Sequence, residues 1–229
     1  TNKDQKTKPE GERALSIPQE FGSYVMENIL FKISFPAEFH AQTAAEAAVT
    51  LHPEVKNRLD DIDKIVITTH ESAIRIISKV GKLANAADRD HCLQYMTAVP
   101  LIFGSLKAEH YEDDFHEASP IIDSLRNKME VVEDERYTRE YLEPEKRSIA
   151  NAIQVFFKDG SSSENVAVEY PIGHRRRREE GIPLLREKYS TNLSTRFPAQ
   201  IRDAILKLCN DQKTLESTPV QQFMDLFVI

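Results

Sequence analysis

Apolar residues recur at helical spacing in some stretches of this chain and alternate with polar residues in others. The alanine-rich stretch at residues 37–51 predicts a helix, because alanine favours helix and a face of small side chains lets another backbone approach closely. The β-branched run at residues 64–69 predicts a strand. Alternating runs at 152–158 and 164–170 flank Asp159-Gly160 and predict a hairpin whose loop is longer than two residues.

Further patterns complete the expected order of elements. A strand is expected at residues 129–134, where apolar and acidic residues alternate, whereas residues 72–80 fit either a short helix or an extended segment. Residues 137–150 are charged and are expected to be rich in turns. Apolar residues at helical spacing predict three further helices, at residues 91–103, 182–193 and 198–210. This order predicts the α+β class: helices, an antiparallel sheet of about four strands, then helices.

Composition narrows the class of protein. The net charge of −7 gives the chain no general attraction to nucleic acid, and no apolar run reaches the roughly 18 residues of a membrane span. Two cysteines are too few for a disulfide framework, which favours a reducing compartment. Residues 1–21 are polar and resemble neither a signal peptide nor a natural start, so we expect a linker within a longer protein.

The main candidate site is a Phe-Pro turn at the start of the alanine-rich stretch. Pro36 disfavours helix at Phe35, so the turn delivers Glu38, His40 and Gln42 to the first turn of the helix. Backbone N–H groups and the positive end of the helix dipole make that place favourable for an anion. The alternative is a helix cap with a buried, hydrogen-bonded histidine.

Two other segments carry candidate chemistry. His70 and Glu71 directly follow the strand at 64–69, and the alternative for His70 is an edge histidine that faces water. His174 and Arg175 follow the predicted hairpin and begin a run of four arginines. One or two guanidinium groups there could bind carboxylates in bidentate fashion. The run is short and lacks interleaved aromatic residues, which argues against nucleic-acid binding.

Common cofactor motifs are absent from the sequence. It contains no GxGxxG, no Walker loop and no GxSxG, and neither the cysteines nor the seven histidines show metal-ligand spacing. We therefore expect no nucleotide, no metal and no other cofactor.

Five segments, in order, resemble proteins of the MmgE/PrpD family: SFPAEFHAQTAAEAA, ITTHESAIRI, NAADRDHCLQYMTAVPLIFG, EYPIGHRRRREEGIPLL and the terminal DLFVI. The resemblance runs from about residue 22 to 229. It implies a protein about twice as long, with a large helical domain and a smaller α+β domain. On that basis residues 22–180 form the lid-like α+β domain, and residues 181–229 return to a helical domain whose amino-terminal half is missing here.

The same resemblance implies an activity: dehydration of 2-methylcitrate to 2-methyl-cis-aconitate in the methylcitrate cycle of propionate catabolism, without an iron–sulfur cluster. The tricarboxylate would bind in a cleft between the two domains of a homodimeric enzyme. The enzyme would be mitochondrial in fungi and cytoplasmic in bacteria. Glu38 and His40 are then the expected catalytic residues, and the expected substrate-binding residues are Lys32, Gln42, His70, Glu71, Arg75, His174 and Arg175.

Two alternatives remain open. The related cis-aconitate decarboxylase branch has a catalytic histidine where this chain has Glu38, a departure that favours the dehydratase. The chain could also be a non-catalytic folding and dimerisation fragment.

Overall fold

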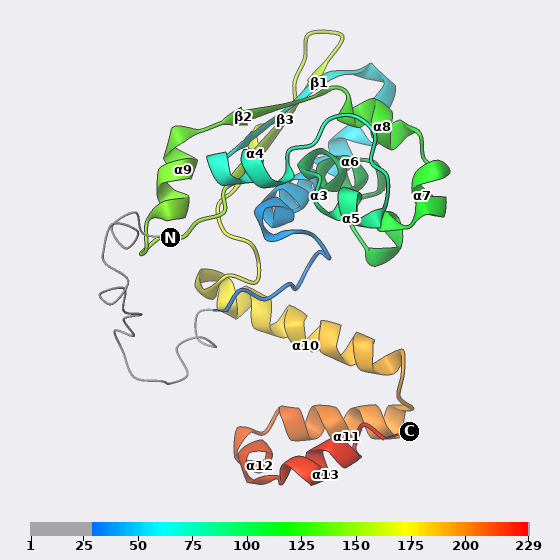
Figure 1. Cartoon of the computed structure of the whole chain (residues 1–229), viewed down its shortest axis with the longest axis vertical. Helices are drawn as coiled ribbons and strands as arrows, with labels where there is room; N and C mark the ends of the chain where they lie inside the picture. The colour runs from blue at the N-terminus through cyan, green and yellow to red at the C-terminus, as the bar shows by residue number, and fades with distance from the viewer. Residues whose placement is uncertain (1–28, 229) are drawn as a thin grey trace, which may run out of the picture.

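The computed structural model describes residues 29–228, so the expected lead-in at residues 1–21 lies outside the described residues. The described residues contain a four-stranded sheet in the order β2-β1-β3-β4, which lies against one group of helices in Figure 1. The strands are β1 (Ile62–Thr69), β2 (Met129–Glu133), β3 (Asn151–Phe157) and β4 (Val166–Val168). The predicted α+β class and the expected four strands are confirmed.

The direction of one strand corrects the expectation of an antiparallel sheet. β3 pairs antiparallel with both β1 and β4, but β2 pairs parallel with β1. The chain between β1 and β2 passes through a set of helices and returns to run in the same direction, as a parallel connection requires. The sheet is therefore mixed, and the carboxyl ends of β1 and β2 lie at the same edge.

The alanine-rich segment forms the buried helix α3 (Gln42–Val55), which packs on α6 (Leu93–Phe103). It begins later than residue 37, because the 3-10 helix η2 (Phe39–Ala41) precedes it. Its alanines, Ala44, Ala45, Ala47 and Ala48, have no exposed surface. The close approach extends to the end of α6, where Gly104 has φ 70° and a Cβ would lie 2.8 Å from the ring of His52.

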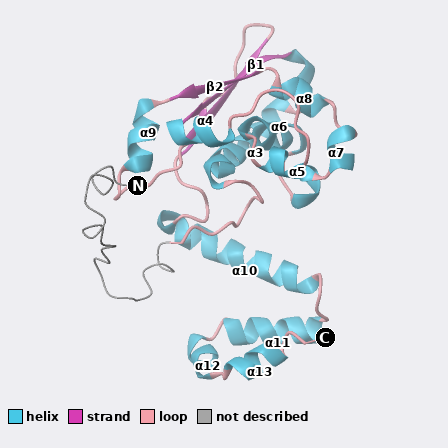
Figure 2. Cartoon of the chain, in the orientation of Figure 1, coloured by secondary structure: helices cyan, strands magenta, loops and turns pink. Residues whose placement is uncertain are grey.

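Short helices make up the crossover from β1 to β2. The ambiguous stretch at 72–80 is helical up to Ile77 and extended after it. This helix, cyan in Figure 2, packs near β2, which is magenta. The crossover elements are α4 (Glu71–Ile77), α5 (Ala86–Asp90), α6, η4 (Ala108–Tyr111), α7 (Asp113–Glu117) and α8 (Ile121–Arg126), and η3 (Leu59–Asp61) precedes β1.

The expectation of turns throughout residues 137–150 is wrong in its first part, because α9 (Glu135–Leu142) is a helix. Tyr137 is the buried residue of this helix, so no stripe of apolar residues in the sequence predicts the helix. The Asp134 side chain caps the helix by accepting a hydrogen bond from the backbone N–H of Arg136, at 2.7 Å.

The carboxyl-terminal helices extend away from the sheet (Figure 1). They are η5 (Arg175–Arg177), α10 (Arg178–Ser194), α11 (Ala199–Cys209), α12 (Gln212–Ser217) and α13 (Val220–Asp225). Apolar side chains on α10, α13 and the last residues stay exposed, among them Leu184, Val220, Met224 and Val228. Within residues 29–228, no helix has both the length and the apolar character needed to cross a bilayer.

The packing of α3 predicts a sharp difference between two positions on the same helix. Ala48→Leu adds volume to a site with no exposed surface, so we expect the free energy of unfolding to fall by about 1–3 kcal/mol. Thr50→Leu, at an exposed position, is the matched control and should change it by less than about 0.5 kcal/mol. Urea unfolding measures both, and equal effects would contradict the close packing of α3.

Candidate active site

One edge of the sheet collects polar side chains from several elements. The parallel strands β1 and β2 both end there, and the antiparallel strand β3 begins there. The backbone N–H of Asp134 donates to the carbonyl of Thr69 at 2.9 Å, which ties the two strand ends together. His70 after β1, helix α9 after β2 and Asn151 at the start of β3 are therefore brought to one place.

The Phe-Pro turn is held by Gln42. Its side-chain amide donates to the carbonyls of Phe35 and Ala37, at 2.9 and 2.8 Å, and the residue is 3% exposed. Gln42 was expected to bind substrate, and the structure gives its amide these backbone partners. The amide fixes the direction in which the turn presents Glu38 and His40.

Asn151 joins the turn to the sheet. Its side-chain amide donates to the carbonyl of His40 and to the hydroxyl of Thr43, both at 2.7 Å. The Thr43 hydroxyl in turn donates to the carbonyl of Ile149 at 2.5 Å. Each bond pairs a buried donor with an acceptor, and together the bonds hold His40 over the edge of the sheet.

Glu38 and His40 form a close pair. The two carboxylate oxygens lie 2.8 and 2.9 Å from Nδ1 of His40, and Glu38 also accepts from the backbone N–H of His40 at 2.8 Å. Burial alone would raise the pKa of Glu38, but the hydrogen bonds and charge of His40 outweigh it and hold that pKa below its usual value. The ionised carboxylate only accepts, so we assign the proton to Nδ1, which leaves Nε2 as a proton acceptor.

His70 is a second imidazole of different character. It has no exposed surface, and its Nδ1 accepts from the backbone N–H of Ala73 at 3.3 Å, which caps α4. Desolvation by burial, followed by the nearby His40, lowers the pKa of His70 to about 4, so the ring is neutral. Its proton is therefore on Nε2, which has no partner among the described residues. The alternative of a histidine facing water is excluded.

Tyr141 on α9 contacts both imidazoles. Its hydroxyl is 3.2 Å from Nε2 of His40, and its ring stacks on His70 with centroids 4.5 Å apart and planes 7° apart. The two imidazole centroids are 5.1 Å apart. Sequence reasoning missed Tyr141 because α9 was not expected. The Asp134 cap, the i,i+4 charge pairs within residues 135–140 and the spacing of four between Tyr137 and Tyr141 were the available signals for it.

A cavity of about 490 Å³ adjoins the Phe-Pro turn. Its lining includes Pro36 of the turn together with Lys32, Lys188, Asp90 and Tyr111, and does not include Glu38 or His40. The Lys32 ammonium also lies 5.4 Å from the centre of the Phe39 ring, between Glu38 and His40 in sequence. The volume of this cavity suits a small ligand.

The remaining expected site residues lie elsewhere. Glu71 and Arg75 form an i,i+4 pair at 3.7 Å on the solvent side of α4, directly after His70. His174 is 3% exposed and caps η5 by accepting from the backbone N–H of Arg176 at 3.2 Å. Arg175 is exposed on η5. The structure thus brings Glu38, His40 and His70 together, with Lys32 at the adjoining cavity, while the binding roles of the others stay predictions.

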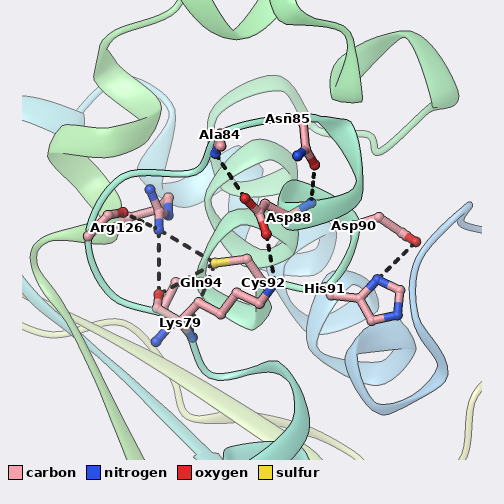
Figure 3. Close-up of polar contacts among 10 residues, drawn as sticks. Lys79, Ala84, Asn85, Asp88, Asp90, His91, Cys92, Gln94 and Arg126 are labelled. Carbon is pink, nitrogen blue, oxygen red and sulfur yellow. Dashed lines mark hydrogen bonds and ion pairs between the residues drawn. The ribbon is translucent and has the colours of Figure 1, made fainter.

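A second polar cluster stabilises the loop before α6 (Figure 3). The buried guanidinium of Arg126 reaches the carbonyl of Gly81 at 3.1 Å and the sulfur of Cys92 at 3.6 Å. Lys79 pairs with Asp88 at 3.2 Å. These contacts hold backbone and buried side chains in place, so we interpret the cluster as structural. Among residues 29–228, no three His, Cys, Asp or Glu side chains are grouped so as to hold a metal ion.

The carboxylate-oriented imidazole of His40, the neutral imidazole of His70 and the phenol of Tyr141 are groups of the kinds used in acid–base chemistry. Residues 35–212 match the MmgE/PrpD C-terminal domain, and the chain belongs to this family.

Curated relatives carry the name 2-methylcitrate dehydratase. The Escherichia coli K12 protein is 53% identical over 212 residues, which is 91% of this chain and 44% of that protein. The Cupriavidus necator protein is 55% identical over the same shares. The mitochondrial protein of Yarrowia lipolytica is 51% identical over 221 residues, covering 95% of this chain and 42% of that protein. The chain therefore spans less than half the length of these relatives.

The neutral state of His70 predicts a pH dependence of stability. Its pKa is about 4 in the fold against 6.5 ordinarily, so between these values the unfolded chain binds a proton that the folded chain does not. The free energy of unfolding should therefore fall as the pH is lowered from about 6.5 toward 4. His70→Asn keeps a capping oxygen and removes the titrating ring, so we expect a shallower fall in urea unfolding at pH 7 and pH 5. Identical slopes for the two proteins would contradict the buried neutral state.

Proposed function

We propose that this chain is the carboxyl-terminal part of an enzyme that dehydrates 2-methylcitrate to 2-methyl-cis-aconitate. The proposal is carried by one observation, the Glu38–His40 pair held beside the unpartnered Nε2 of His70 at the edge of the sheet. Relatives that bear the name 2-methylcitrate dehydratase at 51–55% identity support it.

The chemistry requires groups of the kinds found here. A base must remove a proton from a carbon next to a carboxylate, a donor must assist the leaving hydroxyl, and cations must neutralise the carboxylates. The Glu38–His40 pair supplies the acceptor at Nε2. Lys32 supplies a positive charge at the cavity beside the Phe-Pro turn.

Glu38 is also the residue that separates the two proposed activities. As the partner of His40, its carboxylate orients the ring and stabilises a proton on it. The decarboxylase alternative is tested by offering cis-aconitate and measuring carbon dioxide release, which the dehydratase assignment does not predict.

The wider setting is proposed on the same basis. The helical segment that the relatives carry before this part would supply the other wall of the cleft, and the protein would act as a homodimer in propionate catabolism. The exposed apolar side chains Leu184, Val220 and Met224 on the carboxyl-terminal helices give such packing a surface. The compartment would be the mitochondrial matrix in a fungus and the cytoplasm in a bacterium.

Replacing the proton-handling pair tests the proposed function. In a protein that joins this chain to the amino-terminal segment of its relatives, we expect His40→Asn and Glu38→Gln each to lower kcat on 2-methylcitrate by about 10²–10⁴-fold. Glu54→Gln, on the exposed side of α3, is the matched control and should leave kcat unchanged. Turnover followed by absorbance of the new double bond measures all three, and wild-type kcat/KM in both pair variants would remove them from the site.

The chain on its own tests the alternative of a folding and dimerisation fragment. We expect no turnover of 2-methylcitrate by residues 1–229 alone, because the other wall of the cleft is absent. Turnover by this chain would contradict that expectation. Size-exclusion chromatography with light scattering measures whether the apolar carboxyl-terminal helices associate two copies.

A further inference from the structure

The acceptor nitrogen of the Glu38–His40 pair, Nε2 of His40, already has a hydrogen-bonding neighbour. The carboxylate holds the Nδ1 proton of His40, so Nε2 is the acceptor, and the nearest donor to it is the hydroxyl of Tyr141 at 3.2 Å. A substrate that approached Nε2 directly would have to displace this phenol. The tyrosine is partly exposed, whereas His70 behind it has no exposed surface.

The position of Tyr141 is fixed from two sides. Its ring lies flat on His70, with 7° between the planes. One helical turn earlier, the Thr138 hydroxyl accepts from the backbone N–H of Glu71 at 2.9 Å and donates to Glu133 at 2.7 Å. Helix α9 is thereby attached to the start of α4, and Thr138 and Tyr141 both face the segment that carries His70.

We propose that Tyr141 is the group that exchanges protons with the substrate, activated by the Glu38–His40 pair. This inference rests on the proposed dehydration. The geometry is that of a carboxylate–imidazole–hydroxyl relay, in which the imidazole accepts the hydroxyl proton and the carboxylate stabilises the resulting charge.

The step balances within the site. The Tyr141 oxygen takes the proton from the carbon beside a carboxylate while its own proton moves to Nε2 of His40. The electron pair of the broken C–H bond forms the double bond as the C–O bond breaks. The proton on His40 returns through Tyr141 to the departing hydroxide, so water leaves and both side chains regain their starting protonation.

The test compares variants of the protein that joins this chain to the amino-terminal segment of its relatives. Tyr141→Phe keeps the ring on His70 and removes only the hydroxyl, so we expect kcat on 2-methylcitrate to fall by about 10²–10⁴-fold with little change in KM. Tyr189→Phe is the matched control: its hydroxyl contacts Cys209 on the carboxyl-terminal helices, and its kcat should equal that of wild type.

A second measurement separates proton transfer from packing. Fluorotyrosine placed at position 141 makes the phenol more acidic, so the pH profile of kcat/KM should shift toward lower pH, which a packing role does not produce. If circular dichroism shows that Tyr141→Phe does not fold, the shift of the pH profile by itself tests the role of Tyr141. An unshifted profile, or a Tyr141→Phe protein with wild-type kcat, overturns the role of Tyr141.

The two proposals can fail separately. A wild-type protein without turnover of 2-methylcitrate overturns the proposed function itself. An active wild type that loses activity in His40→Asn but keeps it in Tyr141→Phe overturns the relay through Tyr141 and leaves the dehydration intact.

Discussion

The parallel pairing of β1 with β2 determines where the functional groups meet. It places the ends of both strands at one edge, so the residue after β1 and the helix after β2 become neighbours although about 70 residues separate His70 from Tyr141 in the chain. The antiparallel strand β3 begins at the same edge and brings Asn151 to the carbonyl of His40. With an antiparallel β2, helix α9 would begin at the opposite edge and Tyr141 would not reach either imidazole.

The two imidazoles show how environment divides one residue type between two roles. His40 is partly exposed and has a carboxylate on Nδ1, so it can accept a proton at Nε2 and hold the charge. His70 is fully buried, and both burial and its neighbour His40 disfavour a charge on it, so it stays a neutral donor at Nε2. One ring has a free acceptor nitrogen in this assignment and the other a donor, which is the division of roles that the proposed elimination of water would use.

The sequence predicted the parts of this site whose signals are local. The Phe-Pro turn, the alanine-rich helix and the histidine after a β-branched strand can each be recognised within a few residues, so Glu38, His40 and His70 were found. The direction of β2 depends on how the crossover returns to the sheet, and no local pattern encodes it. Helix α9 was not predicted, because tertiary contacts such as that of Thr138 with Glu71 stabilise it in place of an apolar stripe. Gln42 was predicted to bind substrate, but its side-chain amide holds the turn by donating to backbone carbonyls.

The candidate site contains buried polar atoms that form no hydrogen bond within the described residues. Within the described residues, the Nε2 of His70 and the Oδ1 of Asn151 are buried without hydrogen-bond partners, and an unsatisfied buried donor costs about 1–3 kcal/mol. Both atoms belong to residues next to His40. The His70 ring lies 5.1 Å from the His40 ring, centroid to centroid, and the Asn151 amide donates to the His40 carbonyl. Sequences that maximise stability alone would pair or replace such groups. Both atoms lie beside the Glu38–His40 pair, so in the proposed site they are groups that a ligand or a water molecule could pair with.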